Sequence, residues 1–274
     1  MHRTPSANAV VVGLVALAGL SRVVAAQTYA TEHAVSLSAG VSTAGALWRL
    51  PAQPSLAGSG AGFDTLELAR RFQPGLTLGV GVTRFLRPGL GLGIEALGVV
   101  APMESNCRLR VPVQPDPTEL NGQTCNYVNR MRITATAFAL QGTATLRASP
   151  RRNVSPFVRA AGGIALLGRG YVQMQAEYLT ETGAVGVRRV LDAPGRLVTW
   201  TATVAAGVTL GSGPGGRFRM EIRDIIIGLP VVAGPADAMA TEHPVPATSF
   251  RAVHRPTLVL GVDAVLGGPH QRRY

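Results

Sequence analysis

The charged residues of this chain that could do chemistry together share one face of the predicted β-strands. The segment from Arg217 to Arg223 reads Arg, Phe, Arg, Met, Glu, Ile, Arg. Successive side chains of a strand point to opposite faces, so Arg219, Glu221 and Arg223 point the same way. Three other segments carry charges in the matching phase, namely Glu95, Arg159 and Asp263. We predict that these six side chains form a charge network inside a closed sheet.

Two functions are open for such a network. Five arginines on this face (Arg147, Arg159, Arg217, Arg219 and Arg223) meet three acids. The excess positive charge would suit a gated, anion-selective path, whereas pairing would turn the same groups into a plug. Unpaired charges in a narrow interior are costly, and a ring of eight strands encloses just enough space for side chains. These two arguments favour the plug.

Residue types for catalysis or metal binding are poorly placed. Covalent catalysis requires a nucleophile, a base and an orienting group close together. Ser36 and Ser38 share a predicted strand with His33, but the other histidines after residue 26 lie in loops, at strand ends or in the tail. The sequence therefore predicts a non-enzymatic protein with no catalytic, cofactor-binding or metal-binding residues.

The two cysteines, Cys107 and Cys125, lie in one irregular segment. In an exported chain they can pair and close a loop. A metal or redox pair is the alternative, but there is no CxxC spacing and no nearby histidine. We predict a disulfide in the loop between the third and fourth strands.

Eight segments show the period-two alternation of β-strands. The clearest hairpin is Pro74–Val100, in which Arg87-Pro88-Gly89 separates two alternating runs. The predicted strands cover residues 33–43, 76–86, 90–100, 131–147, 157–166, 198–210, 217–227 and 257–266. Long connections (44–73, 101–130, 168–195 and 228–254) alternate with short turns. Alternation is lost at residues 224–227, which indicates a bulge or a change of phase there.

Residues 1–26 have the features of a cleaved signal peptide. An uncharged apolar run, Ala9–Leu20, follows Arg3, and Val24 and Ala26 fit the −3 and −1 positions of a cleavage site. The run is shorter than the roughly 20 residues that a membrane-spanning helix needs. We expect residues 27–267 to form one barrel domain and 268–274 a short tail. Removing Arg3 and Arg22 lowers the formal charge of +11 by two.

The aliphatic face can look outward to lipid or inward to a soluble core. A soluble lipocalin-like barrel would carry charged and amide residues on its outer face, but the non-aliphatic face here is mostly Thr, Gly and Ala. Long loops at one end and tight turns at the other are typical of transmembrane barrels. We predict an all-β fold: a closed antiparallel eight-stranded transmembrane β-barrel with long outer loops and short periplasmic turns. Two smaller domains are the remaining alternative.

Segments such as Pro74–Val100, Pro156–Leu166 and Arg217–Arg223 resemble the small bacterial outer-membrane β-barrels of the OmpA and OmpW types. The resemblance implies export to the outer membrane of a Gram-negative bacterium. The leading prediction is a non-enzymatic barrel with a structural or surface-interaction role. Resemblance to the OmpW type implies the alternative, a porin-like conduit for small or hydrophobic solutes, and a lipid-modifying enzyme is the third possibility. Leu266 stands where such families usually place a closing aromatic residue.

The expected partners follow from this location and from the basic charge. They are outer-membrane lipid, including the anionic phosphates of lipopolysaccharide, and the barrel assembly machinery. We expect a monomer and no nucleic-acid partner. The candidates for an aromatic girdle are Phe138, Phe157, Tyr171, Trp200 and Phe218.

Overall fold

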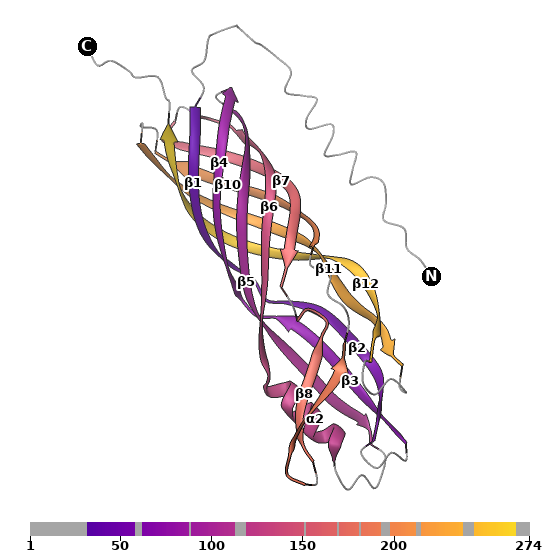
Figure 1. Ribbon diagram of the computed structural model, residues 1–274. Coiled ribbons are helices and arrows are strands. Elements are labelled where there is room, and N and C mark those ends of the chain that lie inside the picture. Colours follow the sequence, from indigo (N-terminus) through magenta and orange to yellow (C-terminus); the bar gives the residue numbers. More distant parts are fainter. Residues whose placement is uncertain are drawn as a thin grey trace, which may run out of the picture. The chain divides into compact units, whose positions relative to one another are not determined.

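The protein is described from a computed structural model (Figure 1). The structure describes residues 32–57, 62–87, 89–112, 119–150, 152–168, 170–180, 182–192, 198–211, 215–237 and 244–266. The predicted signal peptide (1–26) and the tail (268–274) lie outside these ranges. Within the described ranges, no helix has the length and apolar character needed to cross a membrane.

Eight of the described strands close into an antiparallel ring, which confirms the predicted fold. In order around the ring they are β1 (Glu32–Ser42), β4 (Gly75–Arg87), β5 (Leu90–Val111), β6 (Arg132–Arg147), β7 (Val154–Leu167), β10 (Val198–Leu210), β11 (Gly215–Ala236) and β12 (Pro246–Leu266). The pairing of β5 with β6 and that of β1 with β12 close the circle. His33 lies opposite Leu266, so β1 begins and β12 ends at the same end of the barrel.

The long connections are not irregular loops, which corrects the sequence interpretation. β2 (Gly45–Leu56) and β3 (Phe63–Phe72) pair as a hairpin, and β3 also pairs with the distal part of β5. A second hairpin joins β8 (Met174–Leu179) to β9 (Val185–Leu191), and α2 covers Leu120–Arg130. We call these elements, with residues 101–111, 228–236 and 246–256, the outer extension (Figure 1).

Prolines explain why these strands escaped prediction. β2 is an edge strand, and its pairing with β3 shifts between Leu50 and Gln53, where Pro51 lies, while Pro54 is back in register opposite Thr65. Pro102 lies two residues beyond Val100, the last residue of β5 that pairs with β4, and β3 pairs with β5 from Met103 onward. Pro256 likewise lies just beyond the last pair between β12 and β1. Pro51, Pro102 and Pro256 therefore lie where pairing with a neighbouring strand shifts or ends.

The expected bulge at residues 224–227 is wrong. The β11–β12 register runs without a break from Gly215 to Val232 and shifts only between Val232 and Ala236. Ile225 and Ile227 continue the inward phase of Arg223 and are buried. The chemistry of the inward face therefore changes from charged to apolar, while its geometry does not.

The predicted disulfide is confirmed. Cys107 on β5 and Cys125 on α2 are joined, with their Cα atoms 4.9 Å apart. The Asn129 side chain makes two hydrogen bonds to the backbone of Cys107. Its Oδ1 accepts from the Cys107 N–H at 2.7 Å, and its Nδ2 donates to the Cys107 carbonyl at 2.9 Å. The bond therefore fixes α2 against the distal part of β5.

The outer extension has its own core and its own ion pairs. Leu66, Leu68 and Met103 are fully buried there. Glu67 accepts hydrogen bonds from Arg49 and Arg110, and these bonds, with that from Arg49 the largest effect, hold the pKa of the Glu67 carboxyl below its usual value. The extension is thus an ordered body.

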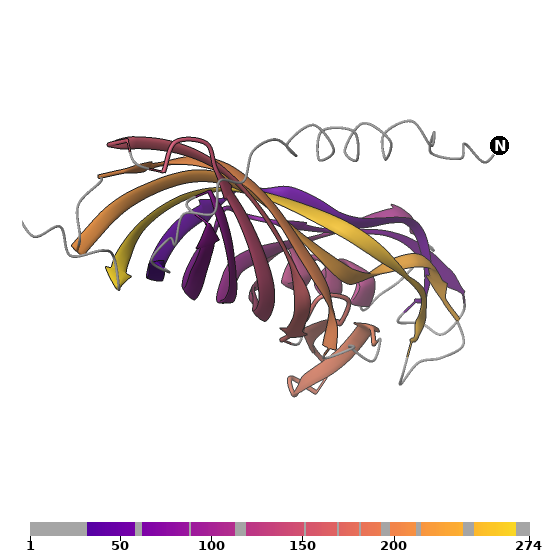
Figure 2. The same ribbon diagram turned by 90° about the horizontal axis from the view of Figure 1, so that it is seen from above.

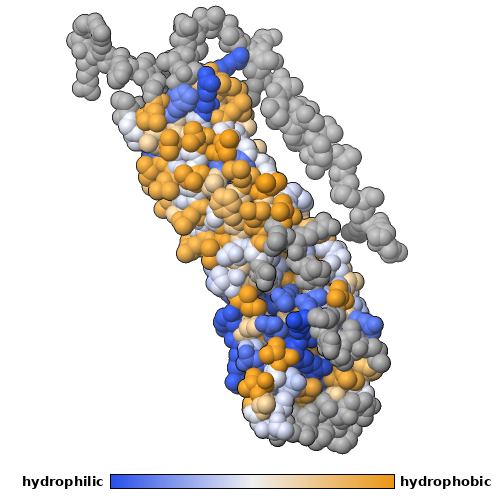
Figure 3. All heavy atoms as spheres, viewed as in Figure 1, coloured by the Kyte–Doolittle hydropathy of each residue, from blue (hydrophilic) through white to orange (hydrophobic). Residues whose placement is uncertain are grey.

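The outward side chains of the ring are apolar. Leu37, Leu78 and Ile222 are 67%, 65% and 68% exposed, and Val204 is also exposed. Hydrophobic colour covers the barrel strands in Figure 3, whereas hydrophilic residues gather on the outer extension. The ribbon seen from above shows the strands curving around the ring (Figure 2). The girdle candidates Phe138, Trp200 and Phe218 are exposed, but Phe157 and Tyr171 are buried, which corrects their assignment.

Candidate functional site: the lumen charge network

Strand β11 supplies most of the charged side chains inside the barrel. Arg217, Arg219, Glu221 and Arg223 alternate with the exposed Phe218, Met220 and Ile222. The inward four are buried because the apolar outward residues fix the phase of the strand.

At the centre of the network two acids meet two arginines. Glu221 accepts a hydrogen bond from Arg223 Nε at 3.0 Å, and Arg223 Nη2 lies 3.1 Å from Glu95 Oε1. Arg159 Nη1 lies 3.6 Å from Glu95 Oε1 and 4.0 Å from Glu221 Oε2. β5, which carries Glu95, is not a neighbour of β11 or of β7 in the ring. The pairs therefore cross the lumen.

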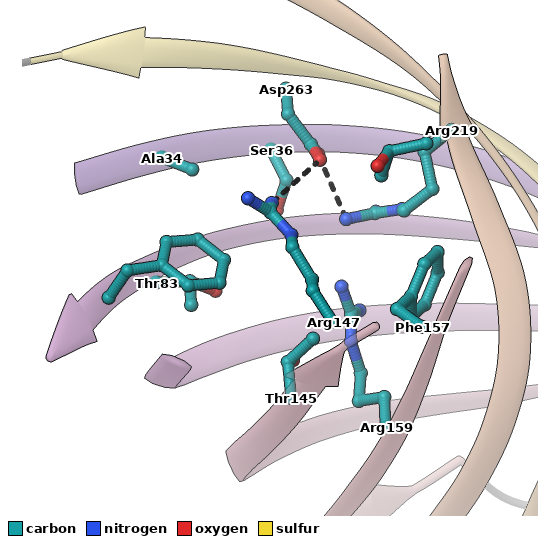
Figure 4. A pocket seen from close by; sticks show the side chains of 11 residues that line it. Ala34, Ser36, Thr83, Thr145, Arg147, Phe157, Arg159, Arg219 and Asp263 are labelled. Carbon is teal, nitrogen blue, oxygen red and sulfur yellow. Dashed lines mark hydrogen bonds and ion pairs between the residues drawn. The ribbon is translucent and has the colours of Figure 1, made fainter. Parts of the chain in front are cut away.

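A second group lies nearer the short-turn end and is drawn in Figure 4. Arg219 Nη1 donates to Asp263 Oδ1 at 2.9 Å, and Arg147 Nη2 lies 4.0 Å from Asp263 Oδ2. Arg219 Nε is also 3.9 Å from Glu221 Oε2, so this group joins the first. The structure thus brings together all six predicted residues.

Glu32 is a member of the network that sequence analysis missed. Its carboxylate pairs with Arg217 Nη1 at 2.5 Å and with Arg147 Nη1 at 3.1 Å. It lies two residues before Ala34 in the inward phase of β1, so extending the alternation by one residue would have found it. The inward charges of this network are then five arginines and four acids, an excess of one positive charge.

Small residues opposite the charges make room for them. A Cβ added at Gly207 would come within 2.7 Å of the Glu221 Cβ, and one at Gly79 within 3.2 Å of Glu95 Oε1. On the same level, Gln141 crosses from β6 to β10, donating to Thr201 Oγ1 at 2.9 Å and accepting from Thr203 Oγ1 at 3.0 Å. The pocket in Figure 4 leaves about 10 Å³ for the centre of a water molecule.

Above the charges, toward the outer extension, the lumen becomes apolar. Leu97, Val99, Ile225, Ile227 and Leu229 are buried and belong to one hydrophobic cluster that continues into the extension. Apart from Arg255, which also lines this layer, the side chains here are apolar, so an ion passing through would lose its hydration without regaining hydrogen bonds from them. The polar network and this apolar layer together close the lumen.

The alternative residues for catalysis do not assemble. Ser36 and Ser38 point inward and lie near the carbonyls of Gly81 and Gly79, at 3.3 and 3.4 Å. His33 is in the opposite, outward phase of β1. Among the described residues, no group of three or more His, Cys, Asp or Glu side chains could hold a metal ion.

A closed antiparallel ring with an apolar outer face and a polar, mostly small-residue lumen defines the class of transmembrane β-barrels. No protein-family model matches the sequence, and no curated protein matches it either. Three solved outer-membrane proteins are structurally similar at low identity.

Neisserial surface protein A is 10% identical, with 85% of this chain and 96% of that chain covered at a TM-score of 0.40. The outer membrane protease OmpT from Escherichia coli is 7% identical, with 86% and 95% covered at a TM-score of 0.32. A Pseudomonas aeruginosa FadL homologue is 8% identical, with 88% and 90% covered at a TM-score of 0.20. The class of this chain rests on its own ring and surface.

Proposed function

We propose that this chain is a non-enzymatic barrel of a bacterial outer membrane, with a closed lumen, that presents its outer extension to partners outside the cell. One observation carries the proposal: ion pairs that cross the lumen lie beneath an apolar layer continuous with the core of the extension. A lumen filled in this way anchors and stiffens the barrel and leaves the extension as the part that can meet partners.

The β8–β9 hairpin supports an interaction role. Leu179, Val185 and Val187 are more than half exposed there, although they lie on an ordered element. Beside them, a groove of about 360 Å³ runs between the hairpin and α2, lined among others by Tyr127 and Tyr178. Exposed apolar side chains rimmed by polar ones are typical of interaction surfaces.

Candidate residues for the proposed lipid partners lie away from this hairpin, at the end of β3 and the start of β6. Arg71 and Arg132 pair there with Glu104, and both arginine side chains are more than half exposed. Exposed arginines suit the phosphates of lipopolysaccharide. The monomeric state and insertion by the barrel assembly machinery belong to the same proposal.

Single-channel recording of refolded protein in planar bilayers tests the closed lumen. We expect the wild type to show no steady current. The double variant Glu221→Ala/Arg223→Ala removes one acid and one arginine, with all of their ion pairs, without changing net charge. We expect it to pass more current than the silent wild type, limited by the apolar layer, which the variant leaves in place.

Steady conductance of the wild type would contradict the proposal. It would favour the conduit for small or hydrophobic solutes, and the single excess positive charge would then predict a preference for anions. If both the wild type and the double variant stay silent, the apolar layer, and not the network, closes the lumen.

A further inference from the structure

A second buried charge lies outside the lumen network. Arg255 on β12 is in the inward phase and only 3% exposed. Its Nη2 donates to Ser42 Oγ at 2.5 Å, and its guanidinium carbon lies 4.5 Å from the centre of the Phe72 ring. Among the described residues, Arg255 Nε and Nη1 have no hydrogen-bond acceptor. Buried N–H donors normally have a hydrogen-bond acceptor, so these two unsatisfied donors need an explanation.

No carboxylate of the described residues neutralises Arg255. The acid nearest in the strand register is Asp224 on β11, but it lies in the opposite, outward phase. Asp224 Oδ1 accepts from the Arg255 backbone N–H at 3.1 Å, and Oδ2 lies 2.7 Å from His254 Nδ1. The Asp224 carboxylate is therefore used on the outer side of the wall.

Arg70, another buried arginine without an acid, shows the usual solution. Its guanidinium donates to Ser105 Oγ at 3.2 Å, to the Gln173 carbonyl at 2.9 Å and to the Gly170 carbonyl, and only Nη2 lacks an acceptor. Burial still lowers the pKa of Arg70 to about 10. Carbonyl oxygens thus compensate Arg70, whereas Arg255 has one hydroxyl and aromatic and aliphatic walls.

Arg255 lines a cavity large enough for a small ion. The other walls include Phe72, Val99, Ile227 and Leu229, together with Tyr171, whose hydroxyl donates to the Thr136 carbonyl, and the space available to the centre of a water-sized particle is about 20 Å³. That volume holds one or two water-sized particles and no alkyl chain. A water molecule could accept hydrogen bonds from Nε and Nη1, but it would leave the charge uncompensated in an apolar cavity.

We propose that Arg255 binds one small monovalent anion, a halide or formate, held by Nε and Nη1. The anion would neutralise the guanidinium where the apolar walls supply no charge. The walls come from the end of β3 (Phe72), from β5 and from β11, so the bound anion would stabilise the junction between barrel and outer extension. The proposed function needs no anion, and either proposal can fail alone.

The test measures unfolding of the refolded wild type at constant ionic strength while bromide replaces sulfate. We expect the stability of the folded protein to rise with bromide concentration along a saturable binding curve. Bromide at ten times its dissociation constant should increase the folding equilibrium constant about elevenfold. A parallel series with formate identifies whether a carboxylate replaces the halide. Anomalous diffraction from bromide-containing crystals should place an ion within hydrogen-bond distance of Arg255 Nε or Nη1.

Arg255→Met should abolish the saturable response. Arg251→Met is the matched control, because it removes one exposed arginine from the same strand and should leave the response unchanged. If Arg255→Met does not fold, the wild-type titration and the bromide position still decide. No saturable response, a response that persists in Arg255→Met, a water in place of bromide, or an adventitious ion only, seen at molar bromide without any effect on unfolding, would each overturn the proposal.

Discussion

The central acid of the lumen offers the sharpest prediction. Glu221→Gln keeps the shape of the side chain and removes its charge. Glu221 is 1% exposed, contacts Arg223, and lies 4.0 Å from Arg159 and 3.9 Å from Arg219. Removing one partner of a buried ion pair costs about 3–5 kcal/mol. Glu95 still pairs with Arg223 at 3.1 Å and with Arg159 at 3.6 Å, so we expect the lower value, about 3 kcal/mol.

Urea unfolding in lipid vesicles, followed by tryptophan fluorescence, would measure this loss. The matched control is Glu104→Gln, which removes a carboxylate that also pairs with two arginines but lies on the surface. Its effect should be much smaller, because water screens exposed pairs. The compensating variant Glu221→Gln/Arg159→Gln returns the excess charge to one and should recover part of the stability.

Two results would refute the reasoning. Equal losses for Glu221→Gln and Glu104→Gln would show that burial of the network has no energetic consequence. The second result would be a loss of folding free energy in the double variant that exceeds the summed losses of Glu221→Gln and Arg159→Gln. It would show that the missing hydrogen bonds, and not charge balance, determine stability.

Three further predictions follow from the surface, the disulfide and the extension. Val204→Arg places a charge on the lipid face and should cost about 2–4 kcal/mol of folding free energy in bilayers, whereas Thr203→Ser keeps the buried hydroxyl and should be nearly silent; equal effects would show that the strand phase is inverted. Reducing the bond between Cys107 and Cys125 should speed proteolysis of the outer extension while the barrel stays protected, since the loop-entropy account gives the bond about 3 kcal/mol; labelling of both thiols in unreduced protein would contradict the pairing. Because the pKa of Glu67 is lower in the folded than in the unfolded protein, its ionised carboxylate stabilises the extension at pH values above the unfolded pKa. This stabilisation is lost as the pH falls through the lower folded pKa. Proteolysis of the extension should therefore rise only in the acidic range, and Glu67→Gln should reduce that pH dependence, leaving the part due to Glu104, whose pKa is also held below its usual value by hydrogen bonds from Arg132 and Arg71.

The sequence by itself determined the ring. Period-two alternation in Pro74–Val100 and in Arg217–Arg223 fixes which side chains share a face, because the side-chain period of a strand is two whatever its neighbours are. The alternation of long and short connections then fixes the antiparallel order. The inward phase of Glu95, Arg159 and Asp263 follows from the same rule, as does the outward phase of Val204.

Only the tertiary structure decided which charges meet. Glu95 and Arg223 lie on strands that are not neighbours, and their contact across the lumen depends on barrel closure and on the stagger of eight strands. The outer extension was hidden for a different reason. Its prolines read as loop residues in sequence, but they fall at strand edges and at register shifts, where a missing N–H costs nothing. The unpaired state of Arg255 was hidden as well, because the sequence does not show whether a carboxylate lies close to an inward-facing arginine.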